Sequence, residues 1–161
     1  MGLLGIISKG IKAMVDEAKK PATFKLGELF EKYARDIIFP EKWYDLVYKT
    51  PDYNANKNDF ADISKNPDFI FRDRYTKKEF QVEVKYRSTL IDGKIVWTNV
   101  NQLKRYQAAE KRSPVFILLA TGKDEDPLTK VYLIPLRDIK YMGIYPSFAA
   151  KYQIPIDESL P

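Results

Sequence analysis

The chain has 161 residues and contains neither cysteine nor histidine. The lack of cysteine excludes disulfides and thiol nucleophiles, and the lack of both residues excludes zinc fingers, serine–histidine mechanisms and histidine-bound metals. Carboxylates, amines and hydroxyls are the groups that remain for any chemistry.

Long apolar runs are also missing, and no stretch reaches the length of a membrane span. The apolar residues 3–7 follow no basic region and are too few for the core of a signal peptide. A cytoplasmic protein without membrane contact is therefore expected. The 27 basic and 22 acidic residues give a net charge of +5, which is compatible with a polyanionic partner but does not demonstrate one.

With 45% hydrophobic and 30% charged residues, the 161-residue chain has the size and composition of one globular domain. Residues 1–20 predict an N-terminal amphipathic helix that packs on its own domain, or alternatively serves dimerisation or surface attachment. Residues 23–136 form the expected core, and residues 137–161 a C-terminal extension.

Periodicity and turn signals predict the elements of this core. Apolar residues at helical spacing predict one helix that is capped by Thr23 and stops at Phe39-Pro40, and another over residues 100–112 that is capped by Asn99. Strands are predicted at residues 43–49, 69–71, 80–86, 115–120 and 131–136, and Asp92-Gly93 predicts a turn before residues 95–97. Together they predict an α/β fold in which a central mixed β-sheet is flanked by helices on its two faces.

Three further expectations concern the last strands of the sheet. The continuous apolar run of residues 115–120 is typical of a strand covered on both faces. Residues 121–129 predict a surface turn, because Gly122 and Pro127 lie there among charged residues. Pro135 predicts an edge position for the strand at residues 131–136, since proline cannot donate to the ladder.

The hairpin of residues 66–88 carries charged residues where a buried hairpin should be apolar. Side chains two apart share a face of a strand, so the second strand separates into an apolar set, Phe80, Val82 and Val84, and a polar set, Gln81, Glu83 and Lys85. Asp68 opens the preceding strand, and antiparallel pairing would bring its carboxylate near that of Glu83.

Two carboxylates about 4 Å apart repel by roughly 4 kcal/mol at an effective dielectric constant near 20. Lys85 offsets part of that repulsion, and a divalent metal would offset more. An all-oxygen site suits Mg²⁺ or Mn²⁺ rather than Zn²⁺. The alternative interpretation is that Gln81, Glu83 and Lys85 form the solvated face of an antiparallel strand.

Four short motifs follow one another along the chain. Gly27-Glu28-Leu29-Phe30-Glu31 comes first, then Pro67-Asp68, then Glu83-Val84-Lys85, and last Gln102-Leu103-Lys104-Arg105-Tyr106. Over residues 23–136 this order resembles the PD-(D/E)XK nuclease superfamily, with its Gly-x-x-x-Glu, Asp, Glu-x-Lys and Gln-x-x-x-Tyr motifs. The resemblance implies a restriction-endonuclease-like three-layer sandwich and a single nuclease-like domain over residues 1–161.

The resemblance also implies a nuclease that hydrolyses phosphodiester bonds with Mg²⁺ or Mn²⁺. Asp68, Glu83 and the backbone carbonyl of Val84 would hold the metal, and Glu31 would bind a second ion or orient a water. Lys85 would position or deprotonate the attacking water and stabilise charge on the phosphate. The implied catalytic residues are Glu31, Asp68, Glu83 and Lys85.

The helix over residues 100–112 is the expected substrate-binding element. Gln102 and Tyr106 lie on one of its faces and would hold the substrate or brace the site. Lys104 and Arg105 suit contact with a nucleic-acid backbone, and a solvated helix surface equally well.

DNA is the expected partner, and two cuts in a duplex need two sites, which is compatible with a homodimer. Two alternatives remain open. One is a non-catalytic nucleic-acid-binding or scaffold protein that retains the nuclease fold. The other is a domain in which the ionic triplet is purely structural, so that truncating Glu83 or Lys85 costs at most about 1 kcal/mol.

Overall fold

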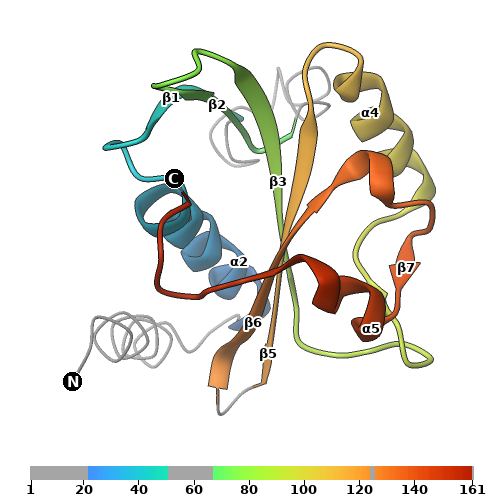
Figure 1. The fold of residues 1–161 in the computed structure, drawn as a ribbon. Coiled ribbons are helices and arrows are strands. Elements are labelled where there is room, and N and C mark those ends of the chain that lie inside the picture. The colour runs from blue at the N-terminus through green and yellow to red at the C-terminus, as the bar shows by residue number, and fades with distance from the viewer. Residues whose placement is uncertain (1–21, 51–66, 124–125, 161) are drawn as a thin grey trace.

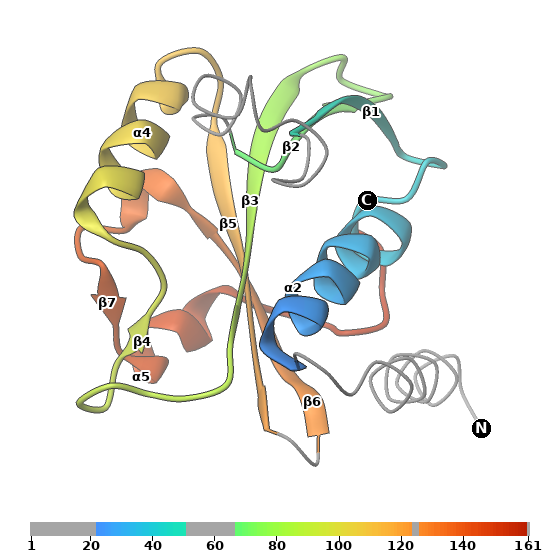
Figure 2. The same cartoon turned by 180° about the vertical axis from the view of Figure 1, so that it is seen from behind.

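The computed structural model describes residues 22–50, 67–123 and 126–160. Helix α2 (Ala22–Tyr33) covers one face of a six-stranded sheet, and helix α4 (Val100–Glu110) covers the other (Figures 1 and 2). The structure therefore confirms a mixed α/β fold with a central sheet flanked by helices. The helix predicted over residues 1–20 lies outside the described ranges.

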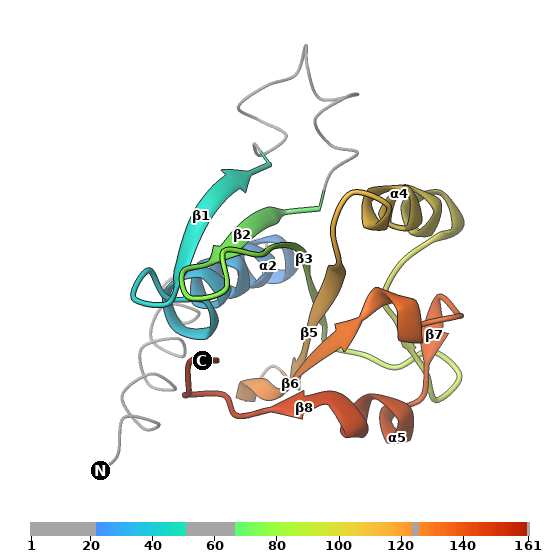
Figure 3. The same cartoon turned by 45° about the horizontal axis from the view of Figure 1, so that its top comes forward.

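The order of the strands explains where helix α4 lies. Across the sheet the strands are β1 (Tyr44–Lys49), β2 (Phe69–Asp73), β3 (Glu79–Arg87), β5 (Val115–Lys123), β6 (Asp126–Pro135) and β8 (Gln153–Ile154), as Figure 3 shows. Strands β3 and β5 are parallel, whereas the other neighbouring pairs are antiparallel. Because a parallel pair needs a crossover, the chain between β3 and β5 passes over one face and places α4 there.

The remaining elements are short. The π-helix η1 (Ala34–Ile38) extends α2, and the two-residue strands β4 (Ile95–Val96) and β7 (Gly143–Ile144) pair in a second sheet. The other short elements are η3 (Leu136–Asp138), α5 (Pro146–Ala149) and η4 (Ala150–Tyr152). Among the described residues, no helix is both long enough and apolar enough to cross a membrane.

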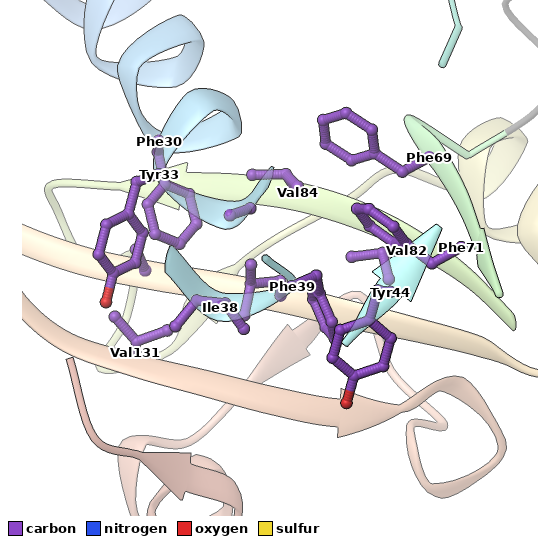
Figure 4. Close-up of a cluster of buried hydrophobic side chains, with 13 residues drawn as sticks. Phe30, Tyr33, Ile38, Phe39, Tyr44, Phe69, Phe71, Val82, Val84 and Val131 are labelled. Carbon is purple, nitrogen blue, oxygen red and sulfur yellow. The ribbon is translucent and has the colours of Figure 1, made fainter. Parts of the chain in front are cut away.

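The core has two halves, one on each face of the sheet. Along β5, Leu118 and Ala120 belong to the cluster on the α2 side, and Ile117 and Leu119 belong to the cluster on the α4 side. All four are fully buried, which confirms the prediction of a strand covered on both faces. Figure 4 shows the α2-side cluster, which is rich in aromatic rings.

The predicted surface turn over residues 121–129 is wrong in its extent. Strand β5 continues to Lys123 and β6 begins at Asp126, with Thr121 opposite Lys130. Each further antiparallel pair satisfies backbone groups of both strands, so the hairpin continues beyond the apolar residues that revealed it.

The predicted edge position of the strand that contains Pro135 is also wrong. Strand β6 has a partner on each side, because Val131 and Tyr132 pair with β8. Pro135 lies three residues beyond Tyr132 at the end of β6, opposite Phe116 of β5. A proline is tolerated there because the outer side of the strand is no longer paired with β8.

Candidate active site

The register of the β2–β3 hairpin places Asp68 beside Glu83. Pairing of the two strands ends at Phe69 and Val82, so the next residues on each strand, Asp68 and Glu83, face each other. The backbone N–H of Asp68 donates to Glu83 Oε2 at 3.1 Å, and the N–H of Val84 donates to Asp68 Oδ2 at 2.8 Å. The Asp68 carboxylate thus accepts a hydrogen bond from a backbone N–H of β3, just beyond the last β2–β3 pair.

Glu83 is buried, and the described contacts satisfy both of its oxygens. Its Oε1 accepts a hydrogen bond from the Tyr106 hydroxyl at 2.7 Å and forms an ion pair with Lys85 Nζ at 3.1 Å. Only 9% of the Glu83 side chain and 12% of the Lys85 side chain are exposed. The interpretation of this strand face as solvated is therefore wrong, because α4 covers it. A buried carboxylate needs such partners to remain ionised.

Four polar side chains of β3 form a row on the face that α4 covers: Gln81, Glu83, Lys85 and Arg87. Gln81 Nε2 donates to the backbone oxygens of Ala109 at 2.8 Å and Ser113 at 3.0 Å, at the C-terminal end of α4. Lys85 Nζ donates to Gln102 Oε1 at 3.4 Å, near the start of the helix. Strand and helix are therefore joined by polar contacts along the whole length of α4.

Thr98 is a member of this network that the sequence analysis did not find. Its hydroxyl donates to Gln102 Oε1 at 3.0 Å, the same oxygen that accepts from Lys85. Thr98 is 7% exposed. The expected cap at Asn99 is confirmed, since Asn99 Oδ1 accepts from the N–H of Gln102 at 2.9 Å. The cap fixes the start of α4, and Thr98 orients the Gln102 amide.

Arg87 is a second residue that the sequence analysis missed. Its Nε donates to the carbonyl of Val96 and its Nη2 to the carbonyl of Trp97, both at 2.8 Å. Burial lowers the pKa of Arg87 below its ordinary value, while Tyr106 and Glu83 act in the opposite direction. The period-two pattern that selects Glu83 and Lys85 also places Arg87 on their face, so the signal was present in the sequence.

Trp97 supports Tyr106 from the side of the second sheet. The two rings stack with centroids 6.0 Å apart and planes inclined by 19°, and Trp97 is fully buried. Burial raises the pKa of Tyr106, and the charge of Glu83 and the hydrogen bond to it add to the increase. Tyr106 therefore stays protonated and serves as a permanent donor to Glu83.

The surroundings of the Asp68 carboxyl group make its ionisation unfavourable. Its pKa is well above the ordinary value, chiefly because the carboxyl is buried and also because Glu83 and Glu31 carry like charges. The Val84 N–H and Lys85 oppose this increase. Three carboxylates from separate parts of the chain therefore act on one another, with Glu31 doing so from α2.

The predicted site residues fall into two groups. Hydrogen bonds or an ion pair connect Asp68, Glu83, Val84, Lys85, Gln102 and Tyr106. Glu31 is close enough to raise the pKa of Asp68. Lys104 is exposed and Arg105 half-buried on α4. The charge of Arg105 acts on the network by opposing the increase in the pKa of Tyr106. Arg105 Nε is buried and has no hydrogen-bond partner among those residues.

The donor set fits a hard divalent cation. Asp68 and Glu83 supply carboxylate oxygens. The pKa of Asp68 is raised chiefly by burial and then by the negative charges of Glu83 and Glu31, which Lys85 offsets in part. Oxygen donors suit Mg²⁺ or Mn²⁺. In the part of the chain that the structure describes, however, no group of three or more acidic side chains is close enough to hold a metal, so Glu31 does not complete a three-carboxylate cluster.

No protein-family model matches the sequence, and no curated protein matches it. Among solved structures, the chain is similar to a Holliday junction resolvase from the archaeal hyperthermophile Archaeoglobus fulgidus. The two share 14% sequence identity, and the match covers 81% of this chain and 91% of the resolvase chain, with a TM-score of 0.49.

Proposed function

We propose that the protein is a metal-dependent nuclease that hydrolyses phosphodiester bonds, with DNA as its substrate. The observation that carries the proposal is the buried Glu83–Lys85 ion pair directly beside the Asp68 carboxyl. Lys85 pairs with Glu83, and its charge also acts on Asp68, whose carboxylate accepts from the N–H of Val84. These residues follow one another in the order along the chain that the nuclease superfamily uses. Burial raises the pKa of Asp68 most and the like charges of Glu83 and Glu31 add to the increase, so a cation bound beside this carboxylate would stabilise its ionised form.

Asp68, Glu83 and the carbonyl of Val84 would hold Mg²⁺ or Mn²⁺, and Glu31 would add negative charge from α2. The ion, when bound, would polarise the phosphate and lower the pKa of a bound water. Glu83 is already oriented for this role, because Tyr106 and Lys85 fix its Oε1 and the N–H of Asp68 fixes its Oε2.

Lys85 is the residue that would act on the reacting phosphate. Glu83 Oε1 and Gln102 Oε1 hold its ammonium at 3.1 and 3.4 Å, so its direction is set before substrate binds. A preorganised ammonium stabilises charge that develops on phosphate oxygens, or orders the attacking water. The contacts of Gln102 and Tyr106 favour a bracing role for both residues, since their polar groups are used within the protein.

The nucleic acid would reach this site along α4. Lys104 and Arg105 are the basic residues of that helix that we assign to the phosphate backbone, and the net charge of +5 supports a polyanionic partner. Cleavage of both strands of a duplex would require two such sites, which a homodimer would supply.

The test is cleavage of a panel of single-stranded DNA, duplex, flap, four-way junction and RNA, with Mg²⁺ or Mn²⁺. We expect metal-dependent cutting that falls by at least about 100-fold in Lys85→Ala, because a positioned proton-transfer or charge-stabilising group contributes on that order. Affinity for the uncut nucleic acid should remain. Lys130→Ala is the matched control, since this lysine is exposed on β6, outside the site, and should cut normally.

The second candidate is a nucleic-acid-binding protein that does not cleave. It is favoured by the fact that no third acidic side chain joins Asp68 and Glu83 closely enough among the described residues. No cutting of any substrate, together with no heat on titrating Mn²⁺ into the protein, would exclude the nuclease. Binding of DNA by the same protein would then favour this candidate over a domain whose ionic triplet is purely structural. In that case Lys85→Ala would bind DNA as well as the unmodified protein does.

A further inference from the structure

A groove of about 820 Å³ lies beside the small β4–β7 sheet. Nine large hydrophobic side chains are exposed in the described part of the chain, and four of these line this groove: Ile91, Tyr141, Met142 and Tyr145. Apolar side chains gathered in one exposed place mark an interaction surface. Because none of the proposed catalytic residues lines the groove, it is a separate feature of the molecule.

Two tyrosines are the most exposed rings of the groove. Tyr141 is 72% exposed and Tyr145 is 56% exposed. Neither ring stacks on another aromatic ring among the described residues. Lys94 Nζ lies 5.2 Å from the centroid of the Tyr145 ring, in cation–π contact. The groove therefore presents unstacked aromatic surface with an ammonium beside it.

The charges around the groove are mainly positive. Lys94 and Lys140 line it, and Lys151 approaches the ring of the lining residue Phe148, with Nζ 5.8 Å from the centroid. Asp92 and Asp138 line it too, and Asp138 Oδ2 accepts a hydrogen bond from the Tyr152 hydroxyl at 3.0 Å. Arg137, next to Asp138 in the chain, is exposed. Two cations and two carboxylates therefore line the groove, and Arg137 and Lys151 beside it add two further positive charges.

Trp97 connects the groove to the candidate active site. Its indole Nε1 donates to the carbonyl of Tyr141 and its backbone N–H to the carbonyl of Met142, each at 3.0 Å. On its other side the Trp97 ring stacks on Tyr106, which holds Glu83. Figures 1 and 2 both show β7 and α5 on the same side of the sheet as α4, so one strand of substrate could follow this side of the molecule.

We propose that the groove binds unpaired nucleotides, with bases stacked on Tyr141 and Tyr145 and phosphates beside Lys94 and Lys140. The inference rests on the proposed function and narrows its substrate class to nucleic acid with a single-stranded segment near the cleaved bond. Exposed aromatic rings interleaved with cations are how proteins hold single strands, since every base has a face that can stack. The excess of cations favours this occupant over an apolar protein segment.

The test is fluorescence anisotropy of a labelled single strand and of a blunt duplex of equal length, measured in EDTA so that nothing is cut. The double variant Tyr141→Ala/Tyr145→Ala should bind the single strand at least about tenfold more weakly, because each stacked base contributes on that order. Its affinity for the duplex should be unchanged. The double phenylalanine variant keeps both rings and should bind as the unmodified protein does.

Tyr75→Ala is the matched control, because Tyr75 is 94% exposed at the β2–β3 turn, outside the groove. Three results would overturn the inference: no binding of single strands by the unmodified protein, equal binding by the double alanine variant, or an equal loss in Tyr75→Ala. A fourth concerns sedimentation. If the unmodified protein is a dimer, and the double alanine variant is a monomer that binds single strands equally well, the groove is a contact between copies of the chain.

Failure of this inference and failure of the nuclease proposal give different results. Strand binding that depends on the tyrosines, in a protein that cuts nothing, leaves the groove assignment standing and removes the nuclease. Metal-dependent cutting by a protein whose single-strand binding does not depend on Tyr141 and Tyr145 supports the nuclease and removes the groove assignment. Both alanine substitutions affect exposed side chains, so circular dichroism should show an unchanged fold.

Discussion

At Asp68 the fold holds a carboxyl group where its charge costs free energy. Burial and the like charges of Glu83 and Glu31 raise its pKa well above the ordinary value. The folded protein therefore binds a proton at Asp68 more tightly than the unfolded chain does. Between the unfolded pKa of about 3.9 and the raised folded pKa, the free energy of unfolding falls as pH rises, because Asp68 loses its proton sooner in the unfolded chain. Above the folded pKa, Asp68 is ionised in both states and the full free-energy cost of its buried charge is present.

Asp68→Asn should therefore stabilise the protein at pH 7 by about 0.5–2 kcal/mol while abolishing cleavage, as is common when a strained functional group is neutralised. The asparagine oxygen can still accept from the N–H of Val84. Urea unfolding at pH 7 and at pH 4 measures the effect. The gain should shrink at pH 4, because Asp68 is then largely protonated in the folded protein and about half protonated in the unfolded chain.

Asp45→Asn is the control for this substitution. Asp45 forms an exposed ion pair with Arg74 at 2.8 Å, so its neutralisation should cost at most about 1 kcal/mol and should not stabilise. If Asp68→Asn instead destabilises the protein at pH 7, the Asp68 charge is already compensated within the fold. The site would then need no further cation to hold the charge of Asp68.

Residues of the site were predictable where local periodicity decides their direction. Alternation along a strand placed Glu83 and Lys85 on one face, and the i, i+4 spacing placed Gln102 and Tyr106 on one face of their helix. Thr98 and Trp97 were not found, because their contacts depend on how the crossover from β3 folds back over the sheet. No local pattern encodes that path.

At the scale of elements, Arg87 connects the crossover to β3, the strand that carries Glu83 and Lys85. It binds the carbonyls of Val96 and Trp97, directly before Thr98 and the cap of α4. The position of Gln102, and through it the direction of Lys85, depends on this attachment. Arg87 is thus a positioning residue, because it acts on the site only through other groups.

Arg87→Met should destabilise the protein by about 1–3 kcal/mol, because buried carbonyls lose their donors. Amide hydrogen exchange at residues 95–98 should accelerate, and kcat should fall more than KM rises. Arg87→Lys should restore little, since an ammonium cannot bridge two carbonyls as the guanidinium fork does. Arg74→Met, which breaks an exposed pair, is the control and should change stability by at most about 1 kcal/mol.

If Arg87→Met leaves exchange at residues 95–98 unchanged, the crossover is held by the β4–β7 pairing instead of by Arg87. That pairing was not predictable, because two strands of two residues each carry no detectable alternation. The extension of the β5–β6 hairpin escaped prediction for a related reason. Backbone pairing continued where Gly122 and Pro127 indicated a turn.

At the scale of the whole molecule, the layered architecture was predictable from which residues are apolar. A strand buried on both faces requires helices or other elements on both sides of its sheet, and the continuous apolar run of residues 115–120 predicts such a strand. The parallel pairing of β3 with β5 then follows from the helix between them. The groove beside β7 was not predictable, because it is formed by segments whose meeting depends on the completed fold.

The net charge of +5 leads to a prediction about salt. Binding of duplex DNA should weaken linearly in log–log form as salt rises, because each phosphate neutralised by a lysine or arginine releases counterions. If DNA lies along α4, Lys104→Ala should lower the slope by about 1 and weaken binding equally for all sequences. Stability should not change, because Lys104 is exposed.

Lys130→Ala is the matched control, since Lys130 is also exposed but lies near the end of the β5–β6 hairpin that points away from α4 (Figures 1 and 2). If DNA binding depended only on the overall positive charge of the molecule, Lys104→Ala and Lys130→Ala would change the salt slope equally. A backbone path along α4 would make only Lys104→Ala change the slope, because counterion release counts the charges that touch phosphates. Equal slopes in the two variants would therefore remove α4 from the DNA path and leave the site without an assigned route for its substrate.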